Sequence, residues 1–137
     1  MLPIADDNPT QSYPVVNHLL IAANIGVFIW TLASGLFAND AEMNRYCFVP
    51  NRFLGHVSIQ EFSTFFSAMF MHAGFAHLIG NMWYLYIFGD NVEDRMGKEN
   101  YLLFYLSCGV LAALTHILVY PTSSIPSLGA SGAIAGV

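Results

Sequence analysis

Charged residues divide the sequence into three long stretches that contain none. Residues 8–39, 62–89 and 100–137 have no Asp, Glu, Lys or Arg. Each stretch exceeds the roughly 20 apolar residues that an α-helix needs to cross the hydrocarbon core of a bilayer. Three such stretches are too many for the core of one small soluble domain. The pattern therefore predicts a polytopic membrane protein built from helices.

The limits of the apolar runs define the expected elements. Gly74 interrupts the second run, which is too long for a single span, so a short segment over 62–72 should precede the second long helix. The mixed polar and aromatic stretch before it is amphipathic, and short helical pieces are expected across 38–73. The sequence predicts long helices at about 15–37, 75–95 and 100–120.

The chain divides into a tail and one membrane domain. Residues 1–14 contain three prolines and polar side chains, which is typical of an extended tail, and 15–137 form the membrane domain. A last apolar segment starts at Ser131, and as a helix to Val137 it would extend only about 10 Å, a third of the bilayer. We therefore expect an incomplete architecture of three full spans and the start of a fourth.

Composition and charge support the membrane assignment. The chain is 55% hydrophobic and 9% charged, whereas soluble domains average about 25% charged residues. A net charge of −5 without a basic patch excludes nucleic acid as a partner and leaves the lipid bilayer. The two cysteines do not suggest a disulfide framework.

Three polar residues lie where the bilayer makes polarity costly: His72, His77 and Asn81. His77 and Asn81 are four residues apart, so a helix places them on one face. Ser131 lies between Gly129 and Gly132, and glycines beside a serine allow a tight turn that leaves the hydroxyl open to a substrate. A serine hydroxyl near side-chain hydrogen-bond donors suits the tetrahedral oxyanion of acyl transfer.

Simpler interpretations of these residues stay open. A histidine or asparagine in a membrane helix more often joins two helices by a hydrogen bond, and small residues near Ser131 are ordinary at helix contacts. A metal site at His72 and His77 is disfavoured, because a spacing of five does not place both on one helix face and no carboxylate or thiolate lies between them. The sequence predicts no metal and no cofactor.

The combined motifs resemble the rhomboid family of intramembrane serine proteases. The pattern H-x4-H-x3-N at 72–81 is followed by G-x-S-G at 129–132. The tail segment PIADDNP (3–9), the NIGVF of the first span and the stretch 68–97 are similar to bacterial members, with Glu93 and Arg95 in the family's E-x-R position. The resemblance covers nearly the whole chain.

The resemblance implies an all-α helical bundle of the rhomboid type and a role for each matched residue. Ser131 would be the nucleophile, and His77 and Asn81 would stabilise the oxyanion. The structural residues would be His72, which braces a membrane-embedded loop, Glu93 and Arg95, which tie a helix end to its neighbour, and Gly129 and Gly132 beside the serine.

Two departures from the family pattern affect these expectations. The family often has Trp-Arg in the loop where this chain has Phe62-Ser63-Thr64, which should loosen the anchoring of the loop. The family's general base is a histidine on its sixth span, and the sequence stops before such a span. Since a serine hydroxyl without a base is a poor nucleophile, we expect the 137 residues alone to be inactive.

The resemblance implies an intramembrane serine endopeptidase that cleaves transmembrane segments of other membrane proteins, in a bacterial cytoplasmic membrane. The alternative is a non-catalytic rhomboid-like protein that binds transmembrane segments without cutting them. Intact His77, Asn81 and Ser131 favour the enzyme, because a binding protein has little need for an oxyanion site.

Overall fold

The computed structural model describes residues 11–137, so PIADDNP and most of the expected tail lie outside the described residues. The described part consists of helices joined by turns and irregular segments and contains no β-strand. Its elements are α1 (Val15–Ala33), η1 (Leu36–Ala38), α2 (Asp40–Met43), α3 (Pro50–Gly55), α4 (Ile59–Ser67), η2 (Ala68–Phe70), α5 (Phe75–Met96), α6 (Lys98–Val119) and α7 (Ser131–Ile134).

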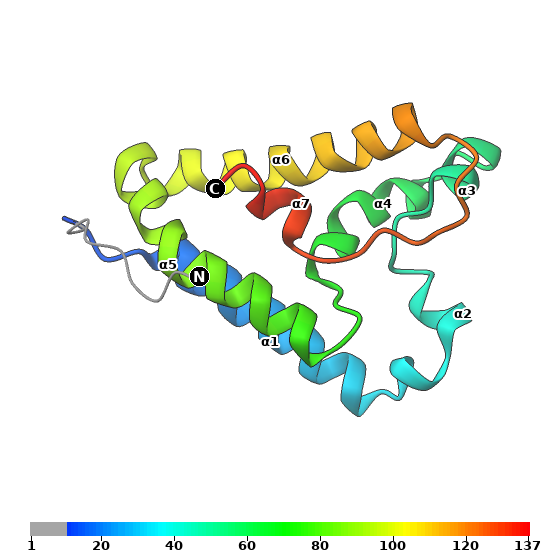
Figure 1. The fold of residues 1–137 in the computed structure, drawn as a ribbon, viewed down its shortest axis with the longest axis horizontal. Coiled ribbons are helices and arrows are strands. Elements are labelled where there is room, and N and C mark those ends of the chain that lie inside the picture. The colour runs from blue at the N-terminus through cyan, green and yellow to red at the C-terminus, as the bar shows by residue number, and fades with distance from the viewer. Residues whose placement is uncertain (1–10) are drawn as a thin grey trace.

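The long helices form an open V (Figure 1). Helices α1 and α5 lie side by side in one arm, and α6 forms the other after a tight turn at Gly97. Helix α4 and the short α7 pack against α6 between the arms. The site predicted around Ser131 therefore lies inside the V rather than on its outer surface.

The membrane architecture predicted from the sequence is confirmed. Helices α1 and α6 are each long and apolar enough to cross a bilayer. A third candidate span consists of α4 with η2 followed by α5, and these two parts are bent by 78° at the break before Phe75. The protein is an all-α membrane bundle with the three long helices close to their expected positions.

Two helix ends differ from expectation. The first span was expected to reach residue 37, but α1 ends at Ala33 because Gly35 adopts a left-handed φ of 74° and closes the helix before η1. The segment from Ser131 was expected to be helical to Val137, but α7 ends at Ile134.

Helix α1 turns its polar side chains inward. Asn17, Asn24 and Thr31 are spaced seven residues apart and are buried, each at most 1% exposed, whereas large apolar side chains such as Leu19 and Ile29 are exposed. Asn24 Nδ2 donates to the Leu20 carbonyl at 2.8 Å, which satisfies the donor locally. Burying polar faces against other helices and exposing apolar faces to lipid is the usual arrangement in membranes.

A buried carboxylate from α5 caps the start of α1. The Glu93 side chain is 1% exposed and accepts hydrogen bonds from the backbone N–H of Val16 at 3.0 Å and of Asn17 at 2.7 Å. These donors belong to the first turn, where no carbonyl within the helix can reach them. The negative carboxylate also lies at the positive end of the α1 dipole.

The Asn17 side chain extends this contact to a third helix. Its Nδ2 donates to the Leu85 carbonyl at 2.9 Å, and its Oδ1 accepts from the Tyr101 hydroxyl at 2.9 Å. Gly89 permits the close approach, because a Cβ there would lie 2.7 Å from the Tyr101 hydroxyl and would also collide with the Asn17 side chain. One polar network thus joins α1, α5 and α6.

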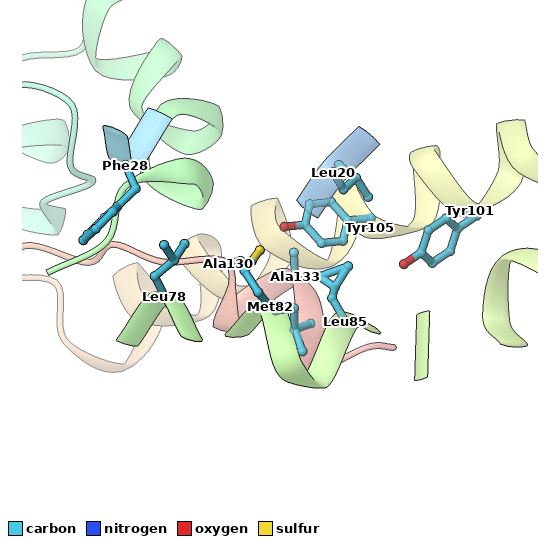
Figure 2. Close-up of a cluster of buried hydrophobic side chains, with 10 residues drawn as sticks. Leu20, Phe28, Leu78, Met82, Leu85, Tyr101, Tyr105, Ala130 and Ala133 are labelled. Atoms are coloured by element: carbon cyan, nitrogen blue, oxygen red, sulfur yellow. The ribbon is translucent and has the colours of Figure 1, made fainter. Parts of the chain in front are cut away.

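An apolar core lies next to this network, and all three long helices and α7 contribute to it. Figure 2 shows Leu85 and Met82 of α5 pointing toward Tyr105 of α6, with Ala130 and Ala133 from the region of α7 beside them. Ala130 and Ala133 are completely buried. Their small size lets α7 pack closely between α5 and α6. This packing sets the position of Ser131 relative to these two helices.

The loop between α1 and α4 is anchored by Arg52. Its guanidinium donates to the carbonyls of Asn44 and Cys47, both at 2.7 Å, and forms an ion pair with Glu61 at 2.8 Å. The loosening expected from the Phe62-Ser63-Thr64 departure stays a prediction, and Arg52 supplies an anchor from another part of the loop.

We expect Gly89→Ala to destabilise the fold by about 1–3 kcal/mol, because the added methyl group overpacks the Asn17–Tyr101 network. Gly80→Ala is the matched control in the same helix: a Cβ at Gly80 meets nothing within 4 Å. There the same change should stabilise the helix by about 0.5–1 kcal/mol. Equilibrium unfolding in detergent micelles measures both, and equal effects of the two variants would contradict the packing argument.

Glu93→Gln should lower the free energy of unfolding by about 1–3 kcal/mol, because an amide offers only one acceptor to the two N–H donors of α1. Arg95→Gln is the control two residues away: Arg95 is exposed and has no ion pair or hydrogen bond within residues 11–137. We expect its effect to stay below about 1 kcal/mol. A larger loss for Arg95→Gln than for Glu93→Gln in the same unfolding measurement would show that the arginine is the structural partner.

Candidate active site

His77 and Asn81 lie in the first two turns of α5. His77 is half-buried and Asn81 is 8% exposed. Both side chains contact the loop that leads into α7. A Cβ built on Gly129 would lie 2.6 Å from His77 Cε1 and Nε2 and 3.6 Å from Asn81 Nδ2. The two polar side chains therefore converge on the backbone at Gly129.

Gly129 is held from its other side by the loop before α5. Its N–H donates to the Ala68 carbonyl at 2.8 Å. Its φ of 113° lies in the region that favours glycine, and any side chain would collide with the His77 ring. Position 129 is thus restricted to glycine by backbone conformation and by space.

Ser131 follows two residues later as the first residue of α7, and it is exposed. It borders a cavity of 110 Å³ whose lining includes Ala68, Gly109 and Ala112 but neither His77 nor Asn81. Gly132 also lines this cavity and packs closely on α6, since a Cβ there would lie 2.8 Å from Ala112 Cβ. The structure therefore brings His77 and Asn81 to Gly129, with Ser131 at the adjacent turn beside a separate small cavity.

Two buried polar atoms near this turn have no hydrogen-bond partner among the described residues: Asn81 Nδ2 and His72 Nε2. Unsatisfied buried polar atoms are costly, and in native structures each calls for an explanation such as a bound water or a functional role. The Asn81 amide is the more relevant of the two, because it also faces Gly129.

His72 lies in the break between η2 and α5 and is completely buried. Its Nδ1 is hydrogen-bonded to the Phe70 carbonyl at 3.2 Å, and its ring packs edge-on against His77 with centroids 5.1 Å apart. These contacts suit a residue that supports the bend and orients the His77 ring. Glu93 and Arg95 lie at the opposite end of α5, remote from this turn.

Alternative reactive groups are poorly placed. Burial raises the pKa of the Cys47 thiol to about 11, partly offset by Arg52, so this thiol stays protonated at neutral pH. Among residues 11–137, no group of three or more His, Cys, Asp or Glu side chains is placed to hold a metal ion. Ser131 is the better candidate for a nucleophile.

Sequence reasoning missed the residues that support the site from a distance. One of them is Ala68, which acts through its backbone carbonyl, so its side chain gives no signal in the sequence. Phe48 and Ser127 exchange backbone hydrogen bonds of 3.1 and 2.7 Å and so join the first loop to the segment before Gly129. Arg52 gave one available signal, as one of the two arginines of the amphipathic first loop.

Comparison with known proteins points to one family. The Rhomboid domain matches residues 60–137, more than half of the chain. A Bacillus subtilis (strain 168) protein, YdcA, whose name assigns it provisionally to the rhomboid proteases, is 31% identical over 125 residues. That match covers 91% of this chain and 59% of YdcA.

Eukaryotic rhomboid-like proteins are also similar to the chain. Rhomboid-like protein 11 of Arabidopsis thaliana chloroplasts is 45% identical over 73 residues, covering 53% of this chain and 26% of the relative. The human mitochondrial presenilin-associated rhomboid-like protein is 33% identical over 118 residues, covering 84% and 29%. No solved structure is significantly similar to the chain.

The chain spans between 26% and 59% of the length of these relatives. The domain match includes the histidine pair, Asn81 and the Gly129–Gly132 turn. With its apolar spans and this match, the chain is an integral membrane protein and belongs to the rhomboid family.

Proposed function

We propose that this chain carries the nucleophile and the oxyanion-stabilising residues of an intramembrane serine endopeptidase that cleaves transmembrane segments of membrane proteins. The observation that carries the proposal is the contact of His77 and Asn81 with Gly129, two residues before Ser131. Side-chain donors from one helix beside a glycine turn that presents a serine are the components that acyl transfer requires.

In this mechanism the Ser131 hydroxyl loses its proton and attacks the carbonyl carbon of the scissile peptide bond. The resulting oxyanion accepts hydrogen bonds from the Asn81 amide and an N–H of the His77 ring. When the intermediate collapses, the amine leaves with a proton and an acyl ester remains on Ser131. Water then hydrolyses the ester and restores the hydroxyl.

The proton on Ser131 needs a base. Within residues 11–137 no histidine is hydrogen-bonded to the Ser131 hydroxyl. The family resemblance implies that the base is a histidine on the sixth span of the rhomboid fold. His72 and His77 are less suitable, because their rings pack on each other and serve the bend and the oxyanion.

The substrate class and location follow from the setting of the site. The half-buried His77 and the buried Asn81 and His72 form a polar region between apolar spans, where a peptide bond within the membrane can meet both donors and water. The similarity to YdcA supports a bacterial cytoplasmic membrane.

We expect Ser131→Ala to abolish cleavage of a transmembrane substrate by the full gene product that contains residues 1–137, reconstituted in liposomes. Ser107→Ala is the matched control, because Ser107 is an exposed serine on α6 outside the lining of the Ser131 cavity. A fluorophosphonate probe should label the parent and Ser107→Ala but not Ser131→Ala.

Residues 1–137 expressed alone should show no Ser131-dependent cleavage, because loss of the base costs up to about 10⁶-fold in kcat. Robust cleavage by this segment would place the base within it. Activity of the full gene product that survives Ser131→Ala would remove the serine mechanism. A full gene product that binds transmembrane segments and never cleaves them would establish the non-catalytic alternative.

Asn81→Ala should lower kcat by about 10²–10³-fold with little change in KM, as expected for one lost oxyanion donor. Asn100→Ala is the control, since Asn100 is exposed at the start of α6, and within residues 11–137 its side chain is hydrogen-bonded only to the Met96 carbonyl. The measurement is steady-state cleavage in liposomes. A change confined to KM would show that Asn81 contributes to substrate binding rather than to the transition state.

A further inference from the structure

The Arg52 side chain binds three groups of the first loop, on both sides of its own position in the sequence. Its three donor groups go to the Asn44 carbonyl, the Cys47 carbonyl and the Glu61 carboxylate. The guanidinium is about one-third exposed and Glu61 only 11% exposed, so the ion pair is partly shielded from solvent. An arginine with a rigid fork of donors can hold two carbonyls and a carboxylate in one geometry, which a lysine cannot.

The segment that Arg52 fixes is itself paired with the chain that precedes Ser131. Phe48, adjacent to Cys47 and 1% exposed, exchanges two backbone hydrogen bonds with Ser127. One turn further on, the Asn51 N–H donates to the Ser123 carbonyl at 3.0 Å. Figure 1 shows the chain between α6 and α7 running alongside α3 and α4 on its way to α7.

The paired segment leads directly into the site. Ser127 is two residues before Gly129, whose N–H is bonded to the Ala68 carbonyl and whose backbone meets His77. The turn that presents Ser131 is thus held at Gly129 by the loop before α5 and at Ser127 by the first loop. The second of these attachments depends on the geometry that Arg52 imposes between Asn44 and Cys47.

We propose that Arg52 is a positioning residue for the reaction: it holds the first loop so that the Phe48–Ser127 pairing places Ser131 in register with His77 and Asn81. This inference rests on the proposed protease function. By this inference the first loop positions the nucleophile in addition to stabilising the fold. Small displacements matter here, because a misplacement of about 1 Å can cost about 100-fold in rate.

The test compares Arg52→Ala, Arg52→Lys and Arg45→Ala in the full gene product. Arg45 is an exposed arginine of the same loop without an ion pair in residues 11–137, so its removal is the matched control. For Arg52→Ala we expect kcat to fall between about tenfold and about 100-fold with KM little changed. The kcat of Arg52→Lys should lie between the values for Arg52→Ala and the parent, and the kcat of Arg45→Ala should equal that of the parent.

Amide hydrogen exchange provides a readout that general destabilisation would not reproduce. In Arg52→Ala the amides of Phe48, Ser127 and Gly129 should exchange faster, while those of α1 and α5 keep their protection. Arg52→Lys, which retains the charge and most of the side-chain volume, keeps the test informative if Arg52→Ala does not fold.

Parental kcat in a folded Arg52→Ala variant, or equal acceleration of exchange in all helices, would overturn the inference. A parent and an Arg45→Ala variant that both fail to cleave would refute the proposed function instead. In that case exchange at Ser127 and Gly129 would still show whether Arg52 positions the turn.

Discussion

Lipid cannot hydrogen-bond to a peptide N–H, and the arrangement of the long helices depends on how that constraint is met at the start of α1. The Glu93 carboxylate takes the N–H groups of Val16 and Asn17, and the Asn17 side chain then joins Leu85 and Tyr101. A buried backbone donor without a partner costs free energy, so this carboxylate favours the position in which the start of α1 meets α5. Gly89 sets how closely the helices approach.

The same constraint organises the irregular backbone around the site. Chain that is not helical can remain at membrane depth only where the protein satisfies its polar groups. The Ala68 carbonyl, at the start of η2, is taken by the Gly129 N–H, and the carbonyls of Asn44 and Cys47 are taken by Arg52. The hydrogen bond between Gly129 and Ala68 therefore satisfies two backbone groups and also holds Gly129 beside His77. The stability of the loops and the geometry of the site depend on the same hydrogen bonds.

Sequence reasoning could predict the features that are local or periodic. Absence of charge locates the spans, and a spacing of four places His77 and Asn81 on one face. Where a local signal opposes the apolar pattern, the predicted helix end is wrong: Gly35 ends α1 four residues early, although the apolar run continues to Phe37. The Phe48–Ser127 pairing could not be predicted, because it joins segments whose proximity exists only after folding. The Arg52 contacts lie within one loop, but two of their acceptors are backbone carbonyls, which no side chain marks in the sequence. Asn17, Asn24 and Thr31 do carry a seven-residue period, which in a membrane helix marks the inward face.

The cap on α1 also has a consequence for biogenesis. Val16 and Glu93 are separated by 77 positions, so a ribosome that has just delivered α1 to the membrane has not yet synthesised the carboxylate that completes it. At about 5–20 residues per second the delay is several seconds. During that interval the N–H groups of Val16 and Asn17 lack the acceptor that they have in the folded bundle. The cap on α1 therefore forms only after α5 has been synthesised, so the two helices complete each other late in the synthesis of residues 1–137.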